Sequence, residues 1–233
     1  MKFSTICHDG FFNKPDKVRD WALTLDYGHT DKGTYPGIRT KCMSLVNPRF
    51  HDSVCSKLLA LYGQYKSSDW SAESYFQKIK RYTDDPNDPV NVGWKHIDGD
   101  KLMGAVIYLD PKSDQLGGTN IYKMKDGVGK KDFETEKYQL QTHTDVLGPK
   151  QSRSEDDLSR YREKIIKHSN NFDTTIKISN VYNRSISYDG SQWHGQSSCW
   201  MPDDIDFRLT LVVFVNSISN NPLDRFYSKS RYV

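Results

Sequence analysis

The sequence has no long apolar run. No stretch of the 233 residues approaches the ~18 consecutive apolar residues that a membrane span needs. Mean hydropathy is −0.77, and the N-terminal residues turn polar before an apolar signal segment or a small-residue cleavage site can form. These absences exclude an integral membrane protein and predict a soluble, cytoplasmic chain.

The sequence also lacks a large excess of charge of either sign. The 33 Lys and Arg residues oppose 30 Asp and Glu residues, for a formal net charge of +3. So small an excess makes neither nucleic acid nor an anionic membrane an obligatory partner. Four dispersed cysteines form no Cys-x-x-Cys pair and no Cys/His cluster of zinc-site spacing, which indicates free thiols in a reducing compartment.

The length and composition indicate one domain with a sizeable core, since 36% of the residues are hydrophobic and 12% are aromatic. Residues 1–73 are predicted to form a helical N-terminal support. It has a helix capped by Asn13 that ends near Gly28, a Gly/Pro/Thr-rich loop at 29–40 and a second helix at 52–65. Residues 74–216 are expected to be the core, and 217–233 a C-terminal tail.

The core shows the pattern of a β protein. Residues 102–109 and 207–215 are apolar almost throughout, which predicts strands buried on both faces. Shorter strands are expected from residue 74 and at 119–122, 174–179 and 184–188. The polar stretch 123–171 is interpreted as an insertion that packs across or beside the sheet mouth as a lid, with a helix at 155–168 capped by Ser154. The fold class is therefore mainly β with flanking helices (α+β), as a two-sheet barrel or jelly roll.

The informative polar residues are histidines with a carboxylate two positions later. On an extended backbone such side chains point the same way, so a His-x-Asp pair can bind one metal ion from one side. Of three such triplets, only His96 and Asp98 directly precede a strong apolar strand. The other two lie in polar segments and are interpreted as loop residues: His29 and Asp31, and His143 and Asp145.

The strand pattern also points to a third metal ligand and to a site for an anion. His194 follows the strand at 184–188 and precedes the second apolar strand, so it can complete the two-histidine, one-carboxylate set of non-haem Fe(II) oxygenases. Arg208 and Thr210 lie two residues apart on that strand and can offer a guanidinium and a hydroxyl to one carboxylate.

Together with residues 108–111, Gly117-Gly118-Thr119 and Tyr188-Asp189-Gly190, this set resembles the 2-oxoglutarate and Fe(II)-dependent oxygenase superfamily, particularly its prolyl-hydroxylase-like branch. The resemblance spans residues 75–216 and implies a double-stranded β-helix core. It also implies that iron and 2-oxoglutarate bind here, with these residues in these roles: His96, Asp98 and His194 for iron, and Arg208, Thr210 and Tyr108 for 2-oxoglutarate.

The implied reaction uses O2 to hydroxylate a C–H bond, with succinate and CO2 as co-products. The substrate would be a peptidyl, proline-like residue or a small amino-acid-like molecule, and the first 70 residues match no catalytic pattern. The separation of Asp98 from His194 is longer than in compact members, which the polar insertion explains. The candidates for the substrate pocket are Asn120, Tyr122 and Trp193.

Two other functional classes stay open. A dioxygenase that acts on a nucleic-acid base fits the many aromatic residues and the slightly basic C-terminal segment, but the weak net charge disfavours it. A non-catalytic, cupin-like metal-binding barrel fits the strand pattern, although no His-x-His followed by Glu occurs at the first half-site. A barrel that has lost its activity is disfavoured because all four key positions are intact.

Overall fold

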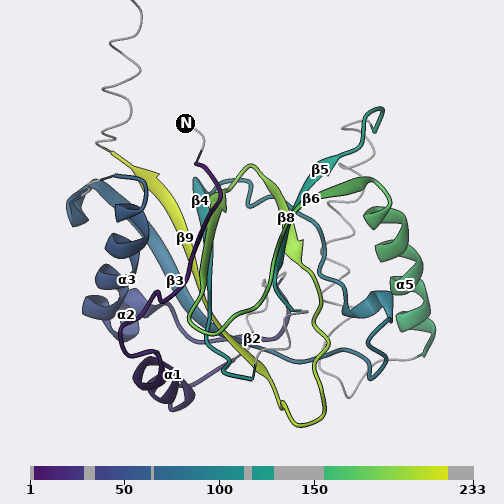
Figure 1. The fold of residues 1–233 in the computed structure, drawn as a ribbon, viewed down its shortest axis with the longest axis horizontal. Helices are drawn as coiled ribbons and strands as arrows, with labels where there is room; N and C mark the ends of the chain where they lie inside the picture. Colours follow the sequence, from purple (N-terminus) through teal and green to yellow (C-terminus); the bar gives the residue numbers. More distant parts are fainter. Residues whose placement is uncertain (1–2, 29–34, 64–65, 113–116, 129–154, 220–233) are drawn as a thin grey trace, which may run out of the picture.

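The computed structural model describes residues 3–28, 35–63, 66–112, 117–128 and 155–219. Two antiparallel sheets face one another, and helices lie outside each of them (Figure 1). The larger sheet has the order β1 (Ile6–His8), β7 (Ser185–Asp189), β4 (Met103–Tyr108), β9 (Arg208–Ile218), β3 (Trp70–Ile79) and β2 (Ile38–Arg39). The smaller sheet has the order β6 (Phe172–Ile178), β5 (Thr119–Met124) and β8 (Trp193–Gln196). This arrangement confirms the jelly-roll fold class.

Strand β9 contributes side chains both to the main hydrophobic core and to the space between the two sheets. Its odd-numbered residues, among them Leu211 and Val213, pack in the main hydrophobic core with the N-terminal helices. Its even-numbered residues, among them Thr210 and Phe214, face the space between the sheets. Because side chains alternate along a strand, a continuous apolar run in the centre of a sheet is buried on both faces, as the sequence predicts.

The N-terminal helices cover the outer face of the larger sheet (Figure 1). They are α1 (Pro15–Leu23), α2 (Met43–Val46) and α3 (Pro48–Ala60). The N-cap of α3 is Asn47, whose side chain accepts a hydrogen bond from the Phe50 amide at 3.1 Å. The predicted helix bounds need correction: α1 has Lys14 as its N-cap and ends before Gly28, and α3 begins earlier than residue 52.

The last helix, α5 (Glu155–Ser169), packs beside the smaller sheet and against the short helix η2 (Pro89–Asn91). Arg162 of α5 pairs with the buried carboxylate of Asp88 at 2.9 Å, and the His168 ring stacks on Trp94 with the ring centroids 4.1 Å apart. No described residue of α5 lines the central cavity, so this helix is not the expected lid. Residues 129–154 of the predicted insertion, with Ser154, lie outside the described residues.

The predicted helical support at residues 1–73 is wrong in one respect, because it also contributes three strands. It includes β1, β2 and the first residues of β3, so the expected boundary at residue 74 falls inside a strand; a short helix η1 (Ser67–Asp69) precedes β3. The expected loop at 29–40 contains β2, and its residues 29–34 lie outside the described residues. Among the described helices, none is long and apolar enough to cross a membrane.

Candidate metal centre and its cavity

Three side chains that are far apart in the sequence meet between the sheets. His194 lies on β8, and His96 lies on an extended segment that pairs with it: each backbone amide donates to the other residue's carbonyl at 2.9 Å. Asp98 is fixed by its own amide, which donates to the Gly190 carbonyl at 2.9 Å. One ligand atom of each of the three residues lies within 4.8 Å of the others.

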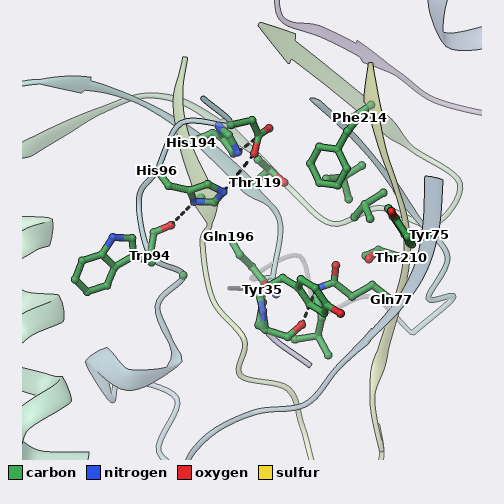
Figure 2. Close-up of a pocket in the computed structure, with 18 of the residues that line it drawn as sticks. Tyr35, Tyr75, Gln77, Trp94, His96, Thr119, His194, Gln196, Thr210 and Phe214 are labelled. Atoms are coloured by element: carbon green, nitrogen blue, oxygen red, sulfur yellow. Dashed lines mark hydrogen bonds and ion pairs between the residues drawn. The ribbon is translucent and has the colours of Figure 1, made fainter. Parts of the chain in front are cut away.

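Backbone carbonyls set the orientation of both imidazole rings (Figure 2). The Nδ1 of His96 lies 2.9 Å from the Trp94 carbonyl, and the Nδ1 of His194 lies 2.8 Å from the Gln192 carbonyl. Since a carbonyl oxygen can only accept, each Nδ1 carries the proton and each Nε2 keeps its lone pair. These Nε2 atoms lie 3.7 Å and 3.5 Å from the Asp98 carboxylate.

The charges of the site suit a divalent cation. Burial and the neighbouring His96 hold the pKa of His194 well below its ordinary value, so the imidazole is neutral. Burial raises the pKa of Asp98, and its Oδ2 atom is buried with no hydrogen-bond partner in the described part of the chain. Two imidazole nitrogens and one carboxylate oxygen on one face of the metal position are a known ligand set for non-haem Fe(II). The residues therefore fit this metal.

Because Gly104 of β4 has no side chain, the Asp98 carboxylate can occupy the space beside it. A Cβ atom on Gly104 would lie 2.7 Å from Asp98 Oδ2 and 2.7 Å from Cε2 of Tyr188. The Tyr188 ring in turn lies 4.3 Å from the His194 ring, measured between centroids. The absence of a side chain at this position is thus part of the site.

These three candidate ligands open onto a cavity of about 970 Å³ between the two sheets. Tyr108, Thr119 and Thr210 line it beyond the ligands, and the Tyr108 hydroxyl donates to Thr119 Oγ1 at 2.7 Å. The Thr210 hydroxyl oxygen is buried and has no hydrogen-bond partner among the described residues. The cavity therefore holds two threonine hydroxyls that can donate to an anion, and Tyr108 donates to one of them.

Arg208 is buried next to this cavity but does not form part of its surface. Its Nη1 donates to the carbonyls of Gly117 at 3.1 Å and Ser198 at 2.8 Å, and its Nη2 donates to the Trp200 carbonyl at 2.9 Å. Gly117 packs directly on the guanidinium, since a Cβ there would lie 1.7 Å from Cζ of Arg208. The structure places the predicted anchor beside Thr210, held by backbone carbonyls.

The three predicted substrate-pocket residues are not on the cavity wall, and this prediction is wrong. Thr119 lines the cavity and Ile121 packs with Tyr108, so the side chains of Asn120 and Tyr122 point to the opposite face of β5. Trp193 packs on Phe172, with the ring centroids 4.8 Å apart. The other two His-x-Asp triplets, at residues 29–31 and 143–145, lie outside the described residues.

Sequence reasoning missed a group on the opposite wall of the cavity, where Figure 2 shows Tyr75, Gln77 and Phe214 facing the two histidines. Arg39 belongs to this wall, and its Nε donates to Gln77 Oε1 at 2.8 Å. Arg39 lies in a segment whose Gly, Pro and Thr content indicates a loop. A two-residue strand carries no periodic signal that could have revealed it.

Comparisons with known proteins find one family and a shared fold. The model of a family of unknown function (DUF6445) matches residues 3–215, and no curated protein matches the chain. Solved 2-oxoglutarate and Fe(II)-dependent oxygenases share the fold, as the resemblance implies. HygX from Streptomyces hygroscopicus, solved with nickel and 2-oxoglutarate bound, is 12% identical with a TM-score of 0.53, over 90% of this chain and 82% of its own.

Two further solved structures are similar. EvdO2 from Micromonospora carbonacea var. aurantiaca is 8% identical with a TM-score of 0.51, over 94% of this chain and 88% of its own. A prolyl-4-hydroxylase from Pseudomonas putida is 11% identical with a TM-score of 0.45, over 93% of this chain and 92% of its own. At these identities the likeness is one of fold.

Proposed function

Because the chain belongs to this family of unknown function (DUF6445), we propose its activity from its own site: an Fe(II)- and 2-oxoglutarate-dependent dioxygenase that hydroxylates a C–H bond. The observation that carries the proposal is the set of His96, Asp98 and His194 at a cavity between two sheets. The fold supports it, since HygX shares this fold and binds nickel and 2-oxoglutarate.

Fe(II), held by His96 Nε2, His194 Nε2 and the Asp98 carboxylate, would supply the redox chemistry and the open positions for 2-oxoglutarate and O2. The chain's own part is to keep these ligands in place. The Trp94 and Gln192 carbonyls fix the two rings, and the neutral state of buried His194 leaves its Nε2 free to bind.

The hydroxyls of the cavity beyond the candidate metal ligands are suited to the distal carboxylate of 2-oxoglutarate. Thr210 offers a buried hydroxyl without a partner among the described residues, and Tyr108 stays protonated because burial raises its pKa. The positive charge of Arg208 lies next to these hydroxyls and favours an anion there. Three bonds to backbone carbonyls hold the Arg208 guanidinium in this position.

The substrate is proposed to be a peptidyl, proline-like residue or a small amino-acid-like molecule, whose C–H bond the protein positions at the metal. A cavity of about 970 Å³ has room for a side chain or a small metabolite beside the co-substrate. Its walls are largely aromatic and aliphatic, which suits the apolar body of such a substrate.

Calorimetric titration of the metal-free protein with Mn(II), and then with 2-oxoglutarate, tests the proposal. We expect one Mn(II) ion per chain, and 2-oxoglutarate binding that requires Mn(II). Thr210→Val should weaken 2-oxoglutarate binding by about tenfold through the loss of one charge-assisted hydrogen bond, without changing Mn(II) binding. Thr174→Val, at an exposed position of β6, is the matched control and should bind like the wild type.

A protein that takes up no Mn(II), or that binds 2-oxoglutarate equally well without metal, would contradict the proposal. Binding of Mn(II) without any binding of 2-oxoglutarate would instead indicate a metal-binding barrel of the cupin type.

A further inference from the structure

A second arginine lies in the cavity and has no role in the site described so far. Arg39 is on the edge strand β2, opposite Gln77 of β3, and its Nε is tied to the Gln77 side chain at 2.8 Å. Its Cζ lies 3.7 Å from the ring centroid of Tyr35, 5.6 Å from that of Tyr75 and 5.5 Å from that of Phe214. Aromatic rings thus hold the guanidinium in one place.

The terminal nitrogens of Arg39 have no partner of their own in the described part of the chain. Within the described residues, no hydrogen-bond acceptor and no carboxylate lies in reach of Nη1 or Nη2. Burial lowers the pKa of Arg39 to about 10, so the group is still charged at neutral pH. Arg39 is half-buried and lines the cavity, so the pair of unused N–H groups at the end of its guanidinium is suited to an oxyanion that enters there.

The position of this guanidinium relative to the metal ligands follows from the strand register. Phe214, Gly104 and Tyr188 are Cα partners in one row across the sheet, and Gly104 lies against the Asp98 carboxylate. The guanidinium of Arg39 lies over Phe214 of that row, and its charge acts on Asp98 and Tyr188. It is therefore at the level of the metal ligands.

The hydroxyls proposed for 2-oxoglutarate belong to a different row. Tyr108 and Thr210 are Cα partners further along the same strands, beyond Val106 and Val212. The backbone of Arg39 lies in this second row, opposite Gln77 and Thr210, but its guanidinium extends along the strands to within 5.5 Å of the Phe214 ring centroid. An anion bound to Arg39 would thus lie beside the metal, where the molecule to be oxidised belongs.

We propose, building on the proposed function, that Arg39 binds an oxyanion of the primary substrate, either a carboxylate or a phosphate, and so positions its C–H bond at the metal. Arginine can bind either group through two parallel N–H···O bonds, whereas lysine offers only a point charge. Tyr35, Tyr75 and Phe214 keep the guanidinium in plane and contact the apolar body of the same substrate.

The test compares three probes with one apolar body and different head groups: benzoate, benzamide and phenyl phosphate. Each is titrated by calorimetry into protein saturated with Mn(II) and 2-oxoglutarate, as wild type, Arg39→Gln and Arg39→Lys. Lys101→Gln is the matched control, because it removes a positive charge that also lines the cavity but is paired with Glu73 at 3.7 Å. Circular dichroism establishes that each variant is folded.

In the wild type we expect at least one anionic probe to bind at least about tenfold more tightly than benzamide. The anion that binds more tightly identifies which oxyanion the site prefers. Arg39→Gln should abolish this preference and Arg39→Lys should retain part of it. Lys101→Gln should retain all of it. The affinity for 2-oxoglutarate should be the same in the wild type and in Arg39→Gln.

Four results would overturn the inference: no preference for an anion in the wild type, a preference that survives in Arg39→Gln, an equal loss in Lys101→Gln, or a loss of 2-oxoglutarate binding in Arg39→Gln. The last would assign Arg39 to the co-substrate. Failure of the proposed function is seen separately, as a wild type that takes up no Mn(II). The same three probes titrated into metal-free protein then still test Arg39.

Discussion

Two backbone carbonyls decide which nitrogen of each histidine faces the cavity. The Trp94 and Gln192 carbonyls each accept from an Nδ1, and each belongs to the residue two positions before its histidine. The extended backbone that carries a ligand therefore also supplies the group that orients it.

Gly104→Ala tests this at the residue scale. The new methyl group would lie closer to Asp98 Oδ2 and Tyr188 than contact allows, so we expect the carboxylate to move and Mn(II) affinity to fall by about tenfold or more. Gly28→Ala, where a Cβ meets nothing within 4 Å, is the matched control. Equal Mn(II) affinities in Gly104→Ala and the wild type would show that this contact does not position Asp98.

His51 should make the stability of the protein depend on pH. His51 lies on α3 and is buried against β3, which holds its pKa below the ordinary value of 6.5, so the unfolded chain binds a proton that the folded chain does not. Its contribution is complete above pH 6.5 and is lost as the pH falls below that. The free energy of unfolding in urea should therefore decrease from pH 7.5 to pH 5 by less in His51→Gln than in the wild type.

An unchanged pH dependence in His51→Gln would mean that His51 is as easily protonated in the folded protein as in the unfolded chain. The amide introduced by His51→Gln can still bond Ser74, whose Oγ lies 2.8 Å from His51 Nδ1, so the variant should fold.

The residues of the site differ in how far the sequence could predict them. His96, Asp98 and His194 were predictable because a short spacing and the adjoining apolar strands make a recognisable pattern. Asn120 and Tyr122 were predicted on the wrong face of β5, since a shift of one residue in a strand exchanges its two faces and no pattern in 119–122 fixes that parity.

At the scale of elements, strands of five or more residues were predictable and those of two to four residues were not. Strands β4 and β9 lie between other strands and against a second layer, so their sequences are apolar throughout. Strands β1, β2 and β8 have two to four residues, and their pairing partners come from distant parts of the chain. Their existence depends on tertiary contacts, which no local window of sequence contains.

Leu58→Ala tests the role of the N-terminal helices. The Leu58 side chain of α3 is fully buried in the core between this helix and the larger sheet, so its truncation should lower the free energy of unfolding by about 2–5 kcal/mol. Leu45→Ala, at a position of α2 that is 78% exposed, should change it by less than about 0.5 kcal/mol. Urea unfolding measures both.

Mn(II) affinity of folded Leu58→Ala should equal that of the wild type, because the helices contact only the outer face of the sheet. Reduced affinity in the folded variant would show that the outer layer also shapes the metal site.

At the scale of the whole molecule, the two faces of the larger sheet differ in role: one packs in the hydrophobic core and the other lines the cavity. Its outer face and the helices α1 and α3 form the main hydrophobic core, whereas its inner face carries Arg39, Tyr108, Thr210 and Phe214 into the cavity. The smaller sheet contributes His194 and Thr119 from the other side. The site can therefore change its substrate through a few inward-facing residues while the fold is maintained from outside.

The central claim is that three residues hold iron so that 2-oxoglutarate can chelate it. Anaerobic titration of the protein with Fe(II) and then 2-oxoglutarate tests this most directly, by the visible charge-transfer absorption of the chelate. We expect the band in the wild type, its loss in His96→Ala, and a weaker band at the same concentrations in Arg208→Ala. A folded, iron-loaded wild type that develops no band on addition of 2-oxoglutarate would contradict the account.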